Sequence, residues 1–475
     1  MSETPSIEEL LQRLLLVEAE NRRLAEENRR LAEENAELRR RLGQNPRNSD
    51  QPPSSEGLGK PAPKSLRGKS GRRPGGQPGH EGRTLRQVED PDYVERHEPA
   101  ACGGCGASLA GAPETGVVRR QVFEIPPMKA TVTEYQMVTK QCGCGAHTTA
   151  PAPAQVEAPV QYGPRLTAIV VYLLVAQFGA HKRVAQAVAD LFGVPISQGT
   201  MATMTAKATG RLEVDFLQWL RRKLLAEKLL HVDETGLRVD GRLHWVHSVS
   251  SGKYSLVYVH PKRGTKGIDA GGVIPSYTGT LVHDAWAPYD TYTNVTHVLC
   301  GAHLLRELVA AVETGAAEHW AQQAIDALVA LKTAADATVV DGCTAIEATV
   351  LAEQVGRFRQ AALVGIKDHS GQTSKVGKKL AALARRMHDR EADYLRFAHE
   401  PHAYPFDNNA AEREIRMVKL RQKVSGCMRT LAGAQQFCTI RSYLATAAKH
   451  SINALEALTR LAEDRPLFPL QDQYA

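Results

Sequence analysis

The sequence lacks any apolar run long enough to cross a lipid bilayer. The longest such run, Leu166 to Phe178, covers 13 residues, whereas a membrane-spanning helix needs about 20. The first ten residues are polar and acidic, so they do not form a secretory signal. These two absences predict a cytoplasmic protein with no membrane partner.

The sequence also lacks the features of a disulfide-stabilised protein. It has eight cysteines in 475 residues, and without a secretory signal these cysteines are expected to be metal ligands or core thiols in a reducing compartment. A chain of this length is predicted to contain about three domains.

Residues 1–43 carry a heptad repeat typical of a coiled coil. One apolar column is Leu10, Val17, Leu24, Leu31 and Leu38, and the other column is Ile7, Leu14, Asn21, Asn28, Asn35 and Leu42. The second column occupies the a positions, where Asn lowers stability but specifies a two-stranded register. The pattern therefore favours a parallel homodimer or a higher oligomer, and a solvated single helix is the alternative.

Residues 44–90 are rich in Pro, Gly, Ser and basic residues and cannot bury a core, so they are predicted to be a flexible linker. The stretch from Lys60 to Arg86 has eight basic residues and one acid, and it alone equals the net charge of +7 of the whole chain. Such a tether can hold DNA phosphates without reading sequence, and Lys69, Arg72 and Arg73 are the candidate contacts. A soluble spacer with incidental charge is the alternative.

Residues 91–155 are predicted to form a small zinc-ribbon-like β module. Strands are expected at Arg119–Ile125 and Ala130–Lys140. The pairs Cys102/Cys105 and Cys142/Cys144 flank these strands, and two such cysteine knuckles suit a structural Zn²⁺ site. The second pair is C-x-C rather than C-x-x-C, which leaves His97 and His147 open as substitutes for the fourth ligand.

Residues 160–225 are predicted to be helical. Arg183 to Phe192, a turn at Gly193, and Ser197 to Ala208 have the spacing of a helix-turn-helix, with Ser197 as the N-cap of the second helix. An ordinary helical hairpin has the same pattern, so DNA recognition by this segment remains one of two interpretations.

From residue 226 to residue 303 the pattern changes to short apolar strands. Strands are expected at Leu229–Val232, Leu243–Val249, Tyr254–Val259, Gly279–Asp284 and Val295–Leu299, with a helix from Ala302. Strands that alternate with helices predict a mixed α/β sheet within a multidomain α+β protein.

Three acidic residues stand out in this region and beyond it. Asp233 follows the first apolar strand, Asp284 ends the fourth strand, and Glu412 lies in the first turn of a later helix with Asp407 or Asn408 as its cap. Acids at the ends of neighbouring strands meet at one edge of a sheet, and three carboxylates can hold two Mg²⁺ or Mn²⁺ ions. The alternative is a set of turn residues plus a Glu412–Arg416 ion pair.

Several longer motifs resemble those of the insertion-sequence-66 family of DDE transposases. They are NSDQPPSSEG, RRPGGQPGHEG, HVDETG, HDAWAPYD, CGAHLLREL and DNNAAEREIRMVKLRQKVSG. The resemblance covers nearly the whole chain. It implies a ribonuclease-H-like core in which Asp233, Asp284 and Glu412 are the catalytic metal ligands, a helical insertion at residues 304–400, and completion of the core by residues 401–475.

Residues near these acids have simpler expected roles. Glu234 should point to the face opposite Asp233, Trp286 and Tyr289 are expected to pack, and Cys300 and His303 are not assigned a catalytic role. After Glu412 the helix is basic and suits the phosphates of a cut strand. Its candidate DNA contacts are Arg413, Arg416, Lys419, Arg421 and Lys423, and a solvated charged face is the alternative.

Together these patterns predict a nucleoid-associated transposase that binds double-stranded DNA, both terminal repeats and target, and performs metal-dependent cleavage and strand transfer. A non-catalytic DNA-binding regulator and an inactive transposase-derived accessory protein are the alternatives. The repeat sequence, the choice between cut-and-paste and copying, and the need for accessory proteins of the same element are not encoded in these patterns.

Overall fold

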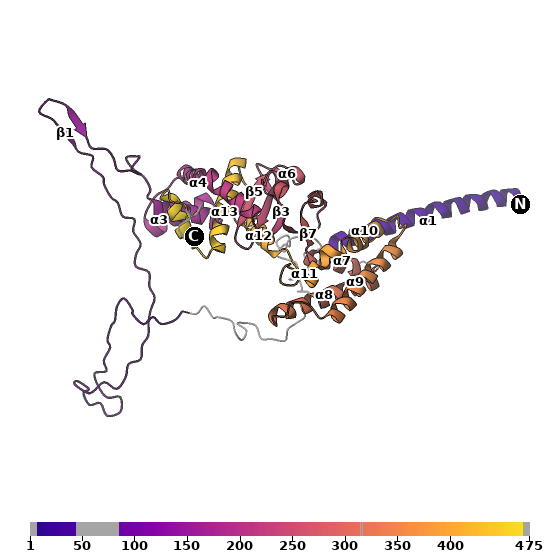
Figure 1. The fold of residues 1–475 in the computed structure, drawn as a ribbon, viewed down its shortest axis with the longest axis horizontal. Helices are drawn as coiled ribbons and strands as arrows, with labels where there is room; N and C mark the ends of the chain where they lie inside the picture. The colour runs from indigo at the N-terminus through magenta and orange to yellow at the C-terminus, as the bar shows by residue number, and fades with distance from the viewer. Residues whose placement is uncertain (1–6, 44–84, 314, 316, 469–475) are drawn as a thin grey trace, which may run out of the picture.

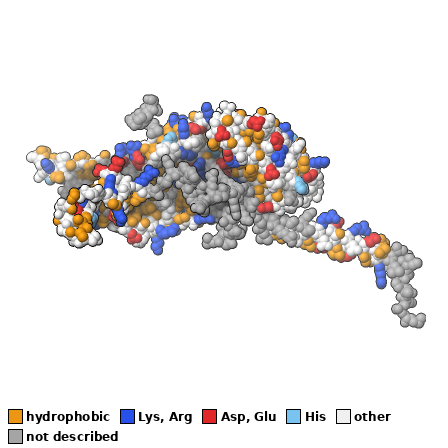
Figure 2. All heavy atoms as spheres, turned by 90° about the horizontal axis from the view of Figure 1, so that it is seen from below, with side chains coloured by type: hydrophobic (Ala, Val, Ile, Leu, Met, Phe, Trp, Pro, Cys, Tyr) orange, Lys and Arg blue, Asp and Glu red, His pale blue; other side chains and the backbone are white. Residues whose placement is uncertain are grey.

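The computed structural model describes residues 7–43, 85–313, 315 and 317–468. Helix α1 (Ile7–Gly43) is a single helix of 37 residues, as its heptads predict. Its predicted seam residues Val17, Leu24 and Leu31 are exposed, and Figure 2 shows hydrophobic side chains along this rod. Most of the predicted linker, including Lys69, Arg72 and Arg73, lies outside the described residues.

The predicted β-rich module is wrong in its strands. Across residues 91–155, all of which the structure describes, only two three-residue strands, β1 (Thr139–Gln141) and β2 (His147–Thr149), pair antiparallel. Arg119–Ile125 has no strand. The side chains alternate as in a strand, but the segment has no ladder partner and almost no buried side chain. Instead, side chains hold it to the preceding segment, since Gln121 donates to the Val88 carbonyl at 2.8 Å.

A helical layer follows this segment. It consists of α2 (Pro164–Val171), a π-helical turn (Tyr172–Ala176), α3 (His181–Phe192), α4 (Gln198–Glu213) and α5 (Asp215–Leu225). Ser197 caps α4 as expected, because its hydroxyl accepts a hydrogen bond from the Thr200 backbone N–H at 3.0 Å. The buried face of α4 presents Met201, Met204 and Leu212 to the core.

The centre of the protein is a five-stranded mixed sheet (Figure 1). Its strands are β3 (Leu229–Val239), β4 (Arg242–Ser250), β5 (Ser255–His260), β6 (Thr280–His283) and β7 (Thr296–Leu299), in the order β5-β4-β3-β6-β7. Strand β4 is antiparallel to both of its neighbours, β5 and β3. Strand β6 is parallel to both of its neighbours, β3 and β7. Short helical turns α6 (Thr265–Asp269), Ile274–Ser276 and Ala287–Thr291 connect them.

The first strand of the sheet is longer than its apolar pattern predicts. It does not end before Asp233 but continues to Val239, because Asp240 and Gly241, both with positive φ, form a tight two-residue hairpin into β4. Asp233 therefore lies within a strand rather than at its end.

The C-terminal helices α12 (Asn409–Ser425), α13 (Leu431–Lys449) and α14 (Ala454–Ala462) share a core with the sheet and with α2 to α5. Helix α13 also covers the open edge of β5. The Ser442 hydroxyl accepts from the Val257 N–H at 2.8 Å, and Thr446 accepts from the Ser255 N–H at 3.2 Å. These bonds satisfy backbone groups that an uncovered edge strand would leave unpaired.

Between β7 and α12 the chain forms the expected helical run. Its helices are α7 (Gly301–Glu313), α8 (Glu318–Val340), α9 (Ala348–His369), α10 (Lys375–Asp389) and α11 (Glu391–His399), and they enclose a second hydrophobic core around Trp320 and Phe358. Within the described ranges, no helix combines the length and hydropathy that a bilayer crossing requires.

Candidate functional site

Asp233 lies on strand β3, and Asp284 directly follows the neighbouring parallel strand β6. Strand β3 pairs with β6 so that Leu230 faces Leu281 and His231 faces Val282, a register that continues to align Asp233 with Asp284. Burial raises the pKa of Asp233 well above its usual value, and the negative charges of Glu234, Asp284 and Glu412 raise it further. All four carboxyl groups therefore share one electrostatic environment at this edge of the sheet.

The backbone after β6 fixes the Asp284 side chain. Its Oδ1 accepts from the Trp286 N–H at 3.0 Å, across an intervening Ala285 whose φ of 68° lies in the left-handed region. A non-glycine residue in this conformation is strained and persists only where the surroundings enforce it, which is common at functional sites. The strained Ala285 forms the turn in which the Asp284 carboxylate accepts the Trp286 N–H.

Glu412 reaches the same edge from the first turn of α12. Asn408 precedes this helix and is buried, and its side chain does not cap the helix. Instead its amide donates to the Val232 carbonyl at 2.7 Å and its carbonyl lies 3.0 Å from His231 Nδ1. Asn408 thus ties the start of α12 to β3 immediately before Asp233.

Glu412 is also paired with cations. It accepts from Arg416 at 2.8 Å and lies 3.5 Å from Arg306 and 4.0 Å from His303. The ion pair that the sequence offered as the alternative role of Glu412 is therefore present, and the residue lies in the acidic cluster at the same time.

Glu234 has partners that the sequence did not predict. Its side chain is almost fully buried, one oxygen accepts from Arg263 at 2.7 Å, and the other accepts from the Tyr289 hydroxyl at 2.7 Å. Burial and the charge of Asp284 nevertheless raise the pKa of Glu234 to about 7. The Arg263 guanidinium lies 4.1 Å from the centroid of the Trp286 ring, so Trp286 and Tyr289 both pack, as expected, but around a charged pair.

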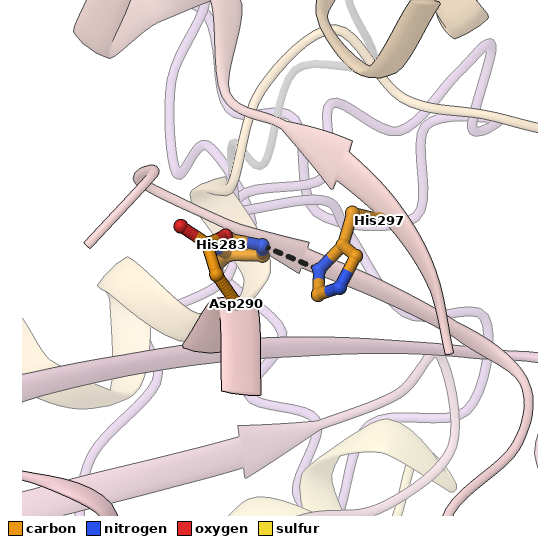
Figure 3. Close-up of side chains that lie close together, drawn as sticks. All are labelled: His283, Asp290 and His297. Carbon is orange, nitrogen blue, oxygen red and sulfur yellow. Dashed lines mark hydrogen bonds between the residues drawn. The ribbon is translucent and has the colours of Figure 1, made fainter. Parts of the chain in front are cut away.

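Among the residues that the structure describes, two groups of three side chains lie close enough to share an ion, and neither contains Asp233 or Asp284. The first is His283, Asp290 and His297 (Figure 3). The Ala285 N–H donates to His283 Nδ1 at 3.2 Å, which places the ring proton on Nε2, and Nε2 lies 3.0 Å from His297 Nδ1. Because this hydrogen-bonded chain uses the nitrogens and Arg390 binds Asp290 at 2.6 Å, the group fits a structural role.

The second group is Cys300, His303 and Glu412. Burial raises the pKa of the Cys300 thiol to about 12, so without a metal ion the sulfur is a neutral thiol. His303, on helix α7, has its buried Nδ1 4.0 Å from Glu412 Oε1 and without a hydrogen-bond partner among the described residues.

The predicted zinc ligands lie on two separate turns and are free thiols. The Cys102 carbonyl accepts from the Gly106 N–H at 2.9 Å, and the Cys142 carbonyl accepts from the Gly145 N–H at 2.8 Å. Cys105 and Cys144, the second members of the two pairs, are both exposed. Each pair therefore forms a tight knuckle of its own.

The single zinc site predicted from the sequence requires the two knuckles to lie together. Among the described side chains, none of the four belongs to a group of three that could share an ion: Cys102, Cys105, Cys142 and Cys144. The physical reason is the missing strand ladder, because Arg119–Ile125 forms no strand and so no hairpin holds Cys105 beside Cys144. A zinc ion bound by both pairs stays a prediction.

The predicted DNA contacts on α12 divide into two kinds. Arg413, Arg416 and Lys423 are exposed. Lys419 and Arg421 are partly buried, and they donate to the carbonyls of Gly236 and Gly426 at 3.0 and 2.8 Å. The helix therefore presents a basic surface that begins beside the carboxylates.

A basic helix that starts next to clustered carboxylates on a mixed sheet is the arrangement expected of an enzyme that processes nucleic acid. Residues 159–436 match the family described as Transposase IS66 family. This match covers more than half of the chain, and the protein belongs to that family of DNA-binding, DNA-processing enzymes of transposable elements. Residues 3–86 match a family of unknown function, DUF6444. No curated protein matches the chain.

The sequence predicted Asn408 only as a possible helix cap, and it did not predict Arg263 or Arg306. Each acts through a contact between segments distant in the chain, for which spacing gives no signal. The motifs DNNAAER and CGAHLLREL contain Asn408 and Arg306, but they do not indicate the contacts of these residues.

Asn408→Ala tests the tie between α12 and β3. We expect a loss of about 1–3 kcal/mol of unfolding free energy, because the Val232 carbonyl and His231 lose a buried partner. Chemical denaturation measures this loss. The adjacent exposed residue supplies a matched control, since Asn409→Ala is expected to change stability by less than about 0.5 kcal/mol. Equal effects of the two variants would contradict the role of Asn408.

Proposed function

We propose that this transposase cleaves DNA strands and joins them to target DNA, with Asp233, Asp284 and Glu412 as the ligands of divalent metal ions on a ribonuclease-H-like sheet. The observation that carries the proposal is geometric, because the parallel register of β3 and β6 aligns Asp233 with Asp284 and Asn408 ties the start of the Glu412 helix to Val232. The order β5-β4-β3-β6-β7, with three antiparallel strands followed by two parallel ones, supports the core assignment.

The donor set fits hard divalent cations. Carboxylate oxygens are the ligands that Mg²⁺ and Mn²⁺ prefer, and the mutual repulsion of several carboxylates is relieved by positive charge. The three acids do not form a group within 4.8 Å among the described residues. A pair of ions about 4 Å apart does not require its ligands to lie that close together, since ligands on the outer sides of the two ions are separated by roughly 8 Å.

When bound there, the ions supply activation of the attacking oxygen and stabilisation of the leaving oxygen in an in-line displacement. The residues of the chain orient the reactants. Asn408 and the strained Ala285 hold Glu412 and Asp284 in place, and Arg413 and Arg416 neutralise phosphates of the strand being cut. In the first reaction water hydrolyses the phosphodiester at the element end. In the second the freed 3′-hydroxyl attacks target DNA, with no covalent protein intermediate.

The ion pairs of Glu412 with Arg416 and Arg306 favour one alternative, an inactive accessory protein in which Glu412 has only a structural role. Strand-transfer assays on element ends distinguish the two functions, because only the enzyme requires the carboxylates for Mg²⁺-dependent products.

Metal binding has a readout that does not depend on activity. At a concentration ten times the dissociation constant, Mg²⁺ is expected to stabilise the fold by about 1.4 kcal/mol, or roughly 1–2 °C in Tm for a chain of this size. The shift should grow as pH rises from 6 to 8, because protons held at the raised pKa values of Asp233 and Glu234 compete with the metal. Calorimetry measures the shift.

Two variants complete the metal measurement. Asp233→Asn should lose the Mg²⁺ shift, while Asp240→Asn, on the exposed hairpin of the same strand, should keep it. A shift of equal size in both variants would place the ion elsewhere.

The dimer is likewise a proposal, supported by the exposed Leu24 and Leu31 on α1. Burial of an exposed Leu contributes about 1.5–3 kcal/mol. Leu24→Glu with Leu31→Glu should therefore convert the dimer into monomer at the same protein concentration. Sedimentation equilibrium measures the mass. Arg22→Glu with Arg29→Glu, outside the apolar columns, is the control that should remain dimeric. A monomeric wild type would refute the coiled-coil assignment.

A further inference from the structure

A groove with a cationic lining lies between the β3–β4 hairpin and the C-terminal half of α12. Its volume is about 390 Å³, and it is lined by Arg238 and Leu243 from the hairpin and by Lys419 and Gln422 from the helix. None of its lining residues is acidic. A cavity with two cations and no carboxylate suits an anionic occupant.

The two cations in the groove are incompletely satisfied by the protein. Lys419 donates to the Gly236 carbonyl at 3.0 Å, and burial lowers the pKa of its ammonium group. Arg238 uses one terminal nitrogen on the Gly241 carbonyl at 2.9 Å, and its side chain is exposed. An anion that entered the groove would replace the solvation that Lys419 has lost.

The segment after α12 contains one further cation, Arg429. The Met428 N–H donates to the Arg238 carbonyl at 3.0 Å, and the Asp240 N–H donates to the Met428 carbonyl at 2.9 Å. These two bonds attach residues 426–429 to the end of β3. Arg429 is exposed immediately beyond this attachment.

The start of α3 and the residues before it pack against the end of α12. Arg183 donates to the Val424 carbonyl at 2.9 Å, and the Ser425 hydroxyl donates to the Phe178 carbonyl. Burial lowers the pKa of His181, and the positive charges of Arg421 and Arg429 lower it further. Basic side chains from α3, from the β3–β4 hairpin and from the end of α12 therefore converge, although they are far apart in the sequence.

The groove has a defined distance from the carboxylates. Lys419 is seven residues beyond Glu412 along α12, or about 10 Å at 1.5 Å per residue. The groove therefore lies within the reach of backbone phosphates that neighbour a bond held at Glu412.

We propose that this groove and the exposed start of α3 bind the phosphodiester backbone of duplex DNA beside the cleaved bond, with Lys182 and Arg429 as phosphate contacts. The inference rests on the proposed function, because it takes the carboxylate edge as the place of cleavage. Arg183 acts as a positioning residue that joins the predicted helix-turn-helix to α12. One duplex thereby contacts both elements.

The salt dependence of DNA binding tests the contacts. Because phosphate contacts carry no sequence information, the probe is a fluorescent 30-base-pair duplex of arbitrary sequence, with anisotropy as the readout. Each lost contact lowers the slope of log K against log salt by about 0.9. Lys182→Ala with Arg429→Ala is expected to lower it by about 1.8 and to weaken binding roughly tenfold to hundredfold at 0.1 M salt.

Two variants control for net charge and for folding. Lys378→Ala with Arg385→Ala removes the same charge from exposed positions on α10 and should keep the wild-type slope. Lys182→Arg with Arg429→Lys should also keep it. Equal slopes for wild type and the Lys182/Arg429 alanine variant would overturn the inference.

The wild-type protein supports a second measurement. Cys427 lines the groove, while Cys343 is exposed in the loop between α8 and α9 of the helical insertion. Duplex DNA should slow alkylation of Cys427 by a maleimide and leave Cys343 unchanged, as measured by peptide mass spectrometry. Unprotected Cys427 would overturn the groove assignment even if Asp233 is required for cleavage. Cleavage by Asp233→Asn would instead refute the proposed function and leave the groove result intact.

Discussion

Asp233→Asn is expected to abolish Mg²⁺-dependent strand cleavage and joining while DNA binding persists. Divalent ions at such a site supply several kcal/mol of transition-state stabilisation, and each 1.4 kcal/mol is a factor of ten in rate, so the rate should fall about a thousandfold or more. Asn keeps the size of the side chain but removes the charge that a metal ion requires. Single-turnover assays on labelled element ends measure the loss.

The control for Asp233→Asn is Asp240→Asn, which removes an acid from the hairpin at the other end of β3 and should retain wild-type rates. Anisotropy with the same DNA establishes that both variants still bind. Strand transfer by Asp233→Asn within tenfold of the wild-type rate would exclude Asp233 as a metal ligand.

Glu412→Gln is expected to have an effect on the same scale, a loss of at least about a hundredfold in the rate of the first cleavage. The residue has two possible roles, because it lies in the acidic cluster and is also bound by Arg416 and Arg306. If Glu412 were only an ion-pair partner, Glu412→Gln would remove no more stabilisation than its ion pair contributes. An i,i+4 pair with an exposed partner contributes about 0.3–0.5 kcal/mol.

Arg416→Ala separates these roles. At saturating protein concentration it should reduce the cleavage rate by less than about tenfold, because removal of the arginine leaves the Glu412 carboxylate in place. Rates that fall equally in Arg416→Ala and Glu412→Gln would show that the pair, and not a metal, explains the requirement for Glu412.

The sheet and the helices of the core could be predicted from local pattern. Alternating or continuous apolar residues predicted all five strands, because they indicate which faces of a strand are buried. Heptad spacing predicted the helix α1. The length of β3 was missed because Gly236 and Asp233 interrupt its apolar pattern. The hairpin at Asp240 and Gly241 depends on positive backbone angles, and an Asp-Gly pair is the one local signal for them.

The acids of the site were predictable and their partners were not. Asp233 and Asp284 follow apolar strands, and parallel strands bring such positions together. The contacts of Asn408 with Val232 and of Arg263 with Glu234 join segments 176 and 29 residues apart, and nothing in either local segment specifies them.

The strand predicted at Arg119–Ile125 is wrong for the converse reason. Alternation at Arg119–Ile125 predicts extended backbone but does not provide a partner strand, and without that ladder the knuckle of Cys102 and Cys105 is not held against the knuckle of Cys142 and Cys144. Spacing identified each pair of thiols, but it carried no information on whether the pairs meet.

The central claim is that one pair of divalent ions is shared by Asp233, Asp284 and Glu412. Anomalous diffraction from crystals of the protein with Mn²⁺ and a cleaved element end tests it most directly. The account predicts manganese peaks between these three carboxylates, with Glu412 released from Arg416. Manganese bound instead by His283, Asp290 and His297, with Glu412 still paired to Arg416, would contradict it.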